Sequence, residues 1–277
     1  MTVHRRETVV EAGGAASSRA AAVELWRARE IVRAFAVRSL RIRYRQAVLG
    51  ALWAVGQPLV LLVPFVLFLR GTNRVPGGAP YAAATLASLV GWQYLSSALS
   101  SGAGALVGEA VLVRKTWFPR EAPVVAALGA ALVELVLGLG VFAVAGPFLG
   151  ARLGAGLVAL PLVVAVLVLV AGALALPLAA LNALYRDVRH ALPFLVLVWL
   201  FLSPVTYPLT RVAPSKRVWF ALANPAVGPL DGMRRVLAEG QWPDLRLLGA
   251  SAASSIVIGW VGHRAFRRLA PVLPDVI

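Results

Sequence analysis

Long apolar stretches constrain the fold of this chain more than any other feature of its sequence. A helix needs roughly 20 apolar residues to cross a hydrocarbon core about 30 Å thick. Stretches of that length occur at about 47–69, 82–105, 122–149, 153–181, 191–208 and 244–262. With 60% hydrophobic and only 14% charged residues, the composition is far from that of a soluble domain. The sequence therefore predicts an all-α integral membrane protein with six transmembrane helices.

The distribution of Lys and Arg predicts the orientation of these spans. Placing both ends of the chain in the cytoplasm puts eighteen of the 27 basic residues on that side, in agreement with the positive-inside rule. Two boundaries are ambiguous, because only 150–152 separate the third and fourth spans, and Ser203, Pro204 and Pro208 interrupt the fifth. Five or seven spans are the alternatives to six.

The segment before the first span is basic and amphipathic. Residues 1–23 lack the apolar core of a signal peptide. Over 24–45, apolar residues such as Ile31 and Phe35 lie opposite basic ones such as Arg33 on a helical wheel. Such a helix either lies in the lipid headgroup layer or packs on a partner protein. The predicted division is a disordered cytoplasmic tail (1–23), an interface helix (24–45), a transmembrane domain (46–265) and a second cytoplasmic tail (266–277).

Two cytoplasmic connections are longer than turns and shorter than domains. The first, 108–123, is a short amphipathic piece that ends in an aromatic pair and a proline. The second, 182–190, has alternating charge and fits two turns of exposed helix. Ordinary basic flanking sequence is the alternative explanation for both.

The long loop 209–243 on the opposite side contains one further predicted helix. Asn224 is placed as its N-cap and Pro225 as its first residue, and Gly240 as its stop. Apolar residues recur at helical spacing between them, so a short amphipathic helix is predicted to lie at the outer face or dip into it.

Motifs for nucleotide, metal or nucleic-acid chemistry are missing from the sequence. No Gly-x-x-x-x-Gly-Lys-Ser/Thr run occurs, so the chain has no P-loop of its own. There are no cysteines, and His4, His190 and His263 lie at no metal-ligand spacing. The basic residues behind the formal net charge of +15 lie beside apolar runs, which argues against nucleic-acid binding.

Glu134 is a carboxylate deep in a predicted span, and an intramembrane ionisable group is a functional candidate. It is either a proton-coupling acid or a structural group. As a structural group, it would contact Asn182 or an arginine near a membrane face, or stay protonated in the bundle. An isolated carboxylate makes a poor proton relay, which favours the structural role.

Four motifs follow one another along the chain: 41–58 (RIRYRQAVLGALWAVGQP), 113–120 (VRKTWFPR), 185–189 (YRDVR) and 224–235 (NPAVGPLDGMRR). In this order and topology they resemble type-2 ABC exporter permeases, the group that exports O-antigen, teichoic acid and capsular polysaccharides. The resemblance covers most of 25–265. It places the chain in the bacterial cytoplasmic membrane as a multi-pass protein.

The resemblance implies a homodimer that pairs with two copies of a separate ATPase subunit. That subunit would bind ATP and Mg²⁺, so no cofactor is expected in this chain. The two cytoplasmic connections would dock into the ATPase. The residues that this implies for coupling are Glu109, Arg114, Lys115, Trp117, Phe118, Pro119 and Arg120 in the first connection, and Tyr185, Arg186, Asp187 and Arg189 in the second.

A lipid-linked polysaccharide would first meet the interface helix, where arginines attract its phosphates. The residues assigned to this region are Trp26, Arg38, Arg41, Arg43, Tyr44 and Arg45. Those assigned to the outer-loop helix are Asn224, Pro225, Gly228 and Arg234.

Other functions stay open at the level of sequence. The same fold serves drug and lipid exporters, although the Arg-rich first motif favours polysaccharide. A membrane-embedded glycan-modifying enzyme is a candidate from a different class, against which the absence of clustered catalytic groups argues. A proton-driven transporter would need more than Glu134.

Overall fold

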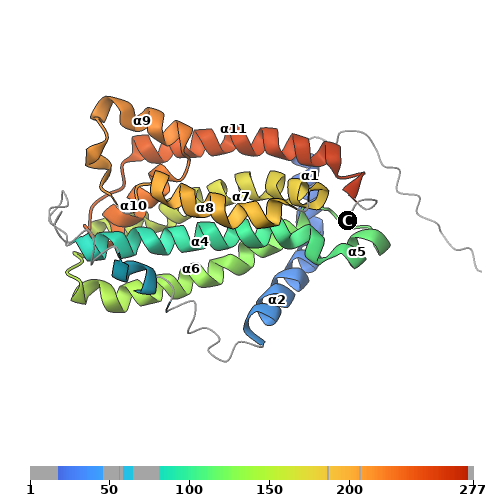
Figure 1. Cartoon of the computed structure of the whole chain (residues 1–277), viewed down its shortest axis with the longest axis horizontal. Helices are drawn as coiled ribbons and strands as arrows, with labels where there is room; N and C mark the ends of the chain where they lie inside the picture. The colour runs from blue at the N-terminus through green and yellow to red at the C-terminus, as the bar shows by residue number, and fades with distance from the viewer. Residues whose placement is uncertain are drawn as a thin grey trace, which may run out of the picture.

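The computed structural model describes residues 18–45, 56, 59–64, 81–185, 187–205 and 207–273. All regular elements among these residues are helices, which confirms the predicted all-α class for this part of the chain (Figure 1). The predicted first span, 47–69, lies outside the described residues except for position 56 and 59–64, which are helical.

Among the described residues, three helical segments are long and apolar enough to cross a membrane. They are α6 (Ala122–Phe148), the segment Ala155–Leu184, and α11 (Leu245–Leu269). The middle one consists of η2 (Ala155–Ala159) and α7 (Leu160–Leu184). These segments coincide with the predicted third, fourth and sixth spans.

The predicted second span is α4 (Tyr81–Gly108), which contacts α6, α7, α8 and α10. Its neighbours approach closely because small residues lie at the contacts. A Cβ added at Gly102 would lie 2.9 Å from the Cβ of Ala175 on α7. One added at Gly138 on α6 would lie 3.0 Å from Val90. Most residues of α4 are buried, so protein surrounds much of this helix.

The predicted fifth span corresponds to α8 (Val188–Leu202), which is apolar but shorter than the others. The prediction that this span extends to 208 is wrong for the helix itself. A proline disfavours helical backbone at the residue before it, and Ser203, which precedes Pro204, is extended with a ψ of 152°.

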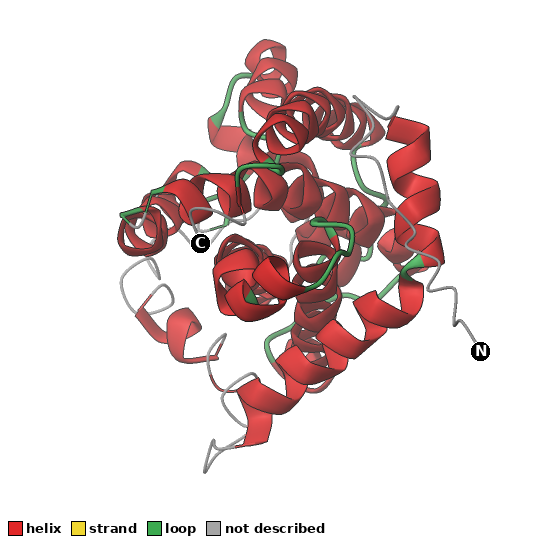
Figure 2. Ribbon diagram, turned by 90° about the vertical axis from the view of Figure 1, so that its right-hand side faces the viewer, coloured by secondary structure: helices red, strands yellow, loops and turns green. Residues whose placement is uncertain are grey.

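One end of the bundle, here called the α5 end, carries α1 (Ser18–Arg27), α2 (Arg29–Arg45) and α5 (Ala110–Lys115). Helices α1 and α2 are nearly continuous, because the amide of Ala28 donates to the carbonyl of Glu24 at 2.9 Å and that of Val32 to Ala28 at 3.0 Å. Helix α2 packs against α6. Figure 2 looks onto this end and shows helices running along the edge of the bundle.

The opposite end, here called the α10 end, carries η3 (Leu209–Arg211), α9 (Pro214–Ala223) and α10 (Val227–Leu237). Helix α10 packs against α4, α7 and α11, and all its residues except Arg235 are buried. Gly240, the predicted stop, lies just after α10 with a φ of 66°, in the left-handed region that favours glycine. A Cβ there would lie 2.6 Å from the carbonyl oxygen of Arg152.

Candidate functional site

At the α5 end, α2 contacts both the α4–α5 junction and the segment that follows α5. The rings of Phe35 and Phe118 pack with centroids 5.5 Å apart. Nη1 of Arg38 donates to Oε2 of Glu109 at 2.9 Å. Glu109 precedes α5 but makes no side-chain capping bond to it, so its carboxylate links α2 to this junction. An apolar contact and an ion pair therefore hold the interface helix on its own chain.

The two faces of α2 differ in their surroundings. Phe35 is buried, and Val32 and Ala36 are half-buried against the core of the bundle. Ile31, Val37 and, on α1, Trp26 stay exposed. The helix therefore packs partly on protein, and its contact with headgroups stays a prediction for the exposed residues.

A groove of about 310 Å³ opens between α2 and the segment around α5. Phe35 and Arg38 contribute to one wall, and Leu112, Trp117 and Phe118 to the other. Trp117 is 62% exposed, whereas Phe118 is buried. The groove is thus lined mainly by apolar side chains, and the exposed ring of Trp117 is one of them.

The residues predicted for coupling divide into an exposed and a buried group. Arg114 and Lys115, which end α5, are exposed together with Trp117. Phe118 and Pro119 are buried. The exposed group can contact another protein directly, whereas the buried group holds the segment on the bundle.

Arg120 directly follows the buried residues Phe118 and Pro119 and is itself half-buried. Its guanidinium carbon is 5.1 Å from the centre of the Phe118 ring, a cation–π arrangement. Burial lowers the pKa of Arg120 from its ordinary value, and among the described residues its buried Nη1 has no hydrogen-bond partner.

A second ionic cluster joins three helices at the α5 end. Nη1 of Arg267, on α11, lies 3.3 Å from Oε1 of buried Glu121 and 3.9 Å from Oε2 of Glu24 on α1. Sequence reasoning missed this cluster because its members are far apart in the chain. The sequence signal for such a cluster was that one basic residue and two acidic residues lie near the ends of three different helices.

The second predicted connection lies at the same end. Tyr185 directly follows α7, and Asp187 directly precedes α8; both are exposed. Nε of exposed Arg189 donates to Nε2 of His190 at 3.0 Å. Arg186, and the side chains of Arg43, Tyr44 and Arg45, lie outside what the structure describes.

At the α10 end, the side chain of Asn224 makes four hydrogen bonds. Its Oδ1 accepts from Nε1 of Trp199 at 3.0 Å and from the amide of Ala226 at 3.2 Å. Its Nδ2 donates to the carbonyl of Leu202 at 3.3 Å and to Oγ of Ser203 at 3.1 Å. Asn224 therefore ties the end of α8 to the turn between α9 and α10.

The prediction that Asn224 is the N-cap of the outer-loop helix is wrong. Asn224 directly follows α9, and α10 begins at Val227. The first amides of α10 would otherwise lack partners. They are satisfied by the Asn224 carbonyl, which accepts from Val227 at 3.1 Å, and by Oγ of Ser251, which accepts from Gly228 at 2.9 Å. A Cβ at Gly228 would lie 2.5 Å from the Leu247 carbonyl oxygen, so glycine permits this approach to α11.

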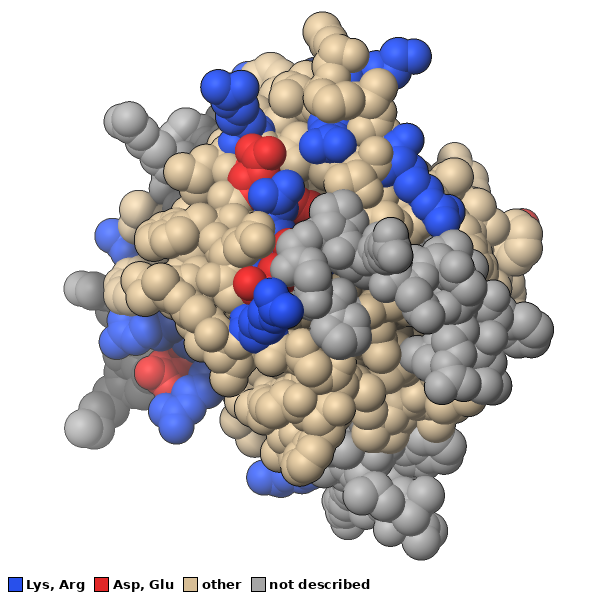
Figure 3. Space-filling view, turned by 90° about the vertical axis from the view of Figure 1, so that its left-hand side faces the viewer, with Lys and Arg blue, Asp and Glu red and all other residues tan. Residues whose placement is uncertain are grey.

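The two buried charged residues of α10, Asp231 and Arg234, each lie beside an oppositely charged side chain. Nε of Arg235 donates to Oδ2 of Asp231 at 2.7 Å. Nε of Arg234 lies 3.3 Å from Oε1 of Glu239. Burial raises the pKa of Glu239, and Arg234 opposes that shift. Figure 3 views this end and shows basic side chains outnumbering acidic ones on the visible surface.

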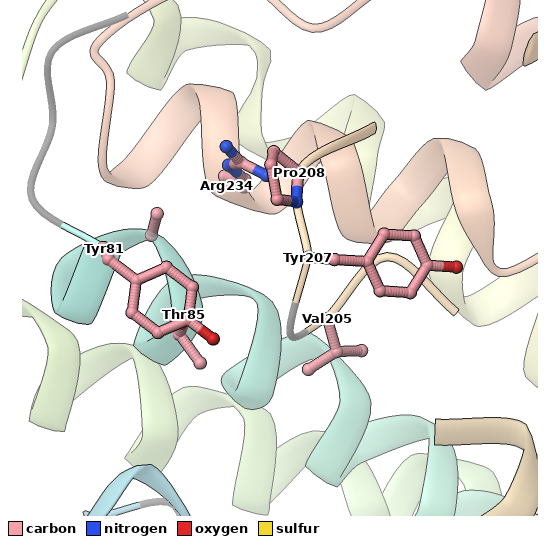
Figure 4. Close-up of a pocket in the computed structure, with 7 residues that line it drawn as sticks. Tyr81, Thr85, Val205, Tyr207, Pro208 and Arg234 are labelled. Atoms are coloured by element: carbon pink, nitrogen blue, oxygen red, sulfur yellow. The ribbon is translucent and has the colours of Figure 1, made fainter. Parts of the chain in front are cut away.

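A small cavity of about 10 Å³ lies beside Arg234 (Figure 4). Tyr81 and Thr85 of α4 line it together with Val205 and Tyr207. Its volume matches about one water molecule, so it is too small for a sugar or a lipid.

The structure places Glu134 half-buried on α6. Nδ2 of Asn182, a partner considered for it, donates to the carbonyl of Ala103 at 2.9 Å and so joins α7 to α4. The described residues contain no group of three or more His, Cys, Asp or Glu side chains that could hold a metal ion.

Comparison with known proteins gives consistent similarities. The family described as ABC-2 type transporter matches residues 30–238. An O-antigen export system permease protein RfbA from Myxococcus xanthus is 29% identical over 246 residues, which are 88% of this chain and 94% of the relative. Two proteins of the same name from Klebsiella pneumoniae are each 23% identical, over 209 residues (73% of this chain, 78% of the relative) and 244 residues (84% and 89%).

Proposed function

The chain belongs to the ABC-2 type transporter family, and from that premise we propose that it is the permease subunit of an exporter that moves a lipid-linked polysaccharide of the O-antigen kind. The observation that carries the proposal is the similarity to an O-antigen export permease over 88% of this chain and 94% of the relative. The relatives are permeases by name, so this multi-pass membrane protein has a transport role rather than a catalytic one.

The proposed topology has six spans with both ends of the chain in the cytoplasm. In this arrangement the α5 end is cytoplasmic and the α10 end faces the other side of the membrane. Arg114, Lys115, Arg189, Arg267 and Arg268 lie at the α5 end, and this accumulation of basic residues supports the orientation.

The proposed partner is a separate ATPase subunit, two copies of which serve a permease homodimer. The ATPase would bind ATP and Mg²⁺, in keeping with the missing P-loop in this chain. The exposed side chains of Arg114, Lys115 and Trp117 support docking at α5. Exposed Tyr185 and Asp187 support a second contact nearby.

The proposed coupling route runs from α5 into the interface helix and α11. A push on α5 reaches α2 through the Phe35–Phe118 contact and the Arg38–Glu109 bond. It reaches α11 through Glu121 and Arg267. Because Arg38 is engaged with Glu109, exposed Arg41 is the better-placed described arginine for a substrate phosphate.

Charge reversal at α5 tests the docking. The doubly substituted protein Arg114→Glu/Lys115→Glu is reconstituted with the cognate ATPase, and the permease-dependent stimulation of ATP turnover is measured. Stimulation should fall severalfold, because like charges would then face the partner. A control with the same charge change at the α10 end, Arg211→Glu/Arg246→Glu, should retain stimulation. Equal stimulation by both double variants would contradict a docking role for α5.

A further inference from the structure

Helix α11 carries an arginine near each end of one outward face. Arg246 and Arg264 are both exposed, and the positions between them make about five full turns, or about 27 Å, of α-helix. No Lys, Arg, Asp or Glu occurs from 247 to 263, and Val257 and Trp260 are exposed on the same side. Because a hydrocarbon core is about 30 Å thick, the two arginines mark the levels at which this face of α11 meets the headgroups.

The side chain of Arg264 folds back along α11 toward the hydrocarbon core. Its guanidinium carbon lies 3.9 Å from the centre of the Trp260 ring, one turn nearer the middle of the helix. This direction agrees with the general tilt of helical side chains toward the N-terminus of their helix. The cation–π contact therefore holds the positive charge at the membrane boundary, whereas a free arginine would extend its head into water.

The protein leaves the charges of Arg264 and Arg268 open to an external partner. Both side chains are exposed, and among the described residues no carboxylate forms an ion pair with either of them. Arg267, between them in the sequence, pairs instead with Glu121 and Glu24. At this end of α11, one arginine thus joins the helix to the bundle and two face outward.

The chemistry of the guanidinium indicates what binds there. A charge at the edge of the hydrocarbon core is costly unless it is paired. A cation–π contact uses none of the five N–H donors of arginine, so those of Arg264 stay available beside Trp260. Guanidinium binds phosphate through paired, charge-assisted hydrogen bonds, and phosphate is the anionic group that phospholipids carry at this depth.

We propose that Trp260, Arg264 and Arg268 form a binding site for one anionic phospholipid, of the phosphatidylglycerol class, in the leaflet at the α5 end. Arg264 binds the phosphate, and Arg268 adds a second positive charge at the headgroup. The exposed side chains of Val257 and Trp260 contact an acyl chain of the same lipid. The site requires a membrane but neither polysaccharide export nor an ATPase, so its test is independent of the proposed function.

Arg246 provides a matched control at the other end of the same face. It is exposed like Arg264, but a carboxylate lies beside it, because Oδ1 of Asp244 accepts from the Arg246 amide at 3.0 Å. Among the described residues, no aromatic ring contacts its guanidinium. Arg246 thus has the position of Arg264 without the features that define the proposed site.

Native mass spectrometry of the full chain tests the proposal. The detergent-purified protein is titrated separately with phosphatidylglycerol, with zwitterionic phosphatidylethanolamine and with a polyprenyl pyrophosphate, and the apparent dissociation constant of the first bound lipid is measured. The variants are Arg264→Gln, Arg264→Lys and the control Arg246→Gln. Circular dichroism and size-exclusion chromatography show that each variant is folded, as expected for substitutions of exposed side chains.

The unmodified chain should bind phosphatidylglycerol severalfold more tightly than phosphatidylethanolamine. Arg264→Gln should lose most of this preference, Arg264→Lys should keep part of it because the charge remains, and Arg246→Gln should keep it fully. Absence of the preference, or an equal loss in Arg264→Gln and Arg246→Gln, would overturn the proposal. Tighter binding of the pyrophosphate than of phosphatidylglycerol, lost in Arg264→Gln, would also overturn it, because the site would then belong to a polyprenyl-linked lipid.

Discussion

A single amide side chain, that of Asn224, holds the end of α8 and the α9–α10 turn together. Replacing it by alanine would leave Nε1 of Trp199 and the amide of Ala226 without these acceptors. Each unsatisfied buried group costs about 1–3 kcal/mol. We expect Asn224→Ala to lower the melting temperature of the detergent-purified protein by several degrees.

Asn182 provides a matched comparison for that substitution. It too is a buried asparagine, but its described hydrogen bond is a single one, to Ala103. Hydrogen bonds between transmembrane helices contribute about 0.6 kcal/mol on average, so Asn182→Ala should lower the melting temperature less. An equal or larger loss for Asn182→Ala would contradict the special role assigned to Asn224.

The importance of Asn224 was predicted from sequence, but its role was not. The Asn-Pro pair looks like a helix start, because Asn favours N-caps and Pro the first helical position. The bonds to Trp199 and Ser203 depend on α8 ending beside this turn. Such tertiary contacts leave no local pattern in the sequence.

At the scale of elements, α2 should stay docked mainly through its aromatic contact. Phe35 is buried, and truncating a buried Phe costs about 3–5 kcal/mol. The Arg38–Glu109 pair is partly exposed, with 53% of the Arg38 side chain accessible, and exposed ion pairs contribute about 0–1 kcal/mol. Phe35→Ala should therefore accelerate amide hydrogen exchange in α2 much more than Arg38→Gln.

Val37→Ala is the control for that experiment, because Val37 lies on the same helix and is exposed. It should leave exchange in α2 nearly unchanged. Faster exchange for Arg38→Gln than for Phe35→Ala would mean that the ion pair, rather than the aromatic contact, holds the helix.

The elements near the α10 end were only partly predictable. Apolar spacing correctly indicated a helix in 224–240, found at Val227–Leu237. Asp231 and Arg234 gave it an amphipathic appearance, yet both are buried because each faces an oppositely charged side chain. Helix α9 was not predicted, although Pro214 at its first position and Val218, Trp219 and Leu222 carried the signal.

For the whole molecule, hydropathy located the long helices but not their places in the bundle. Apolar length predicted α6, α7 and α11, which fit a membrane by composition. Helix α4 was also located, but its central place depends on close contacts such as that of Gly102 with Ala175. The periodicity of apolar residues along a sequence does not indicate which helices pack around a given helix.

The central claim is that this chain moves a lipid-linked polysaccharide with energy from a separate ATPase, and transport itself tests it most directly. The permease and its cognate ATPase are reconstituted in vesicles with fluorescently tagged lipid-linked O-antigen in the ATPase-facing leaflet. The account predicts ATP-dependent appearance of the glycan in the opposite leaflet, lost without the ATPase. Failure to move this substrate, with ATP-dependent transfer of a drug or an ordinary phospholipid instead, would contradict it.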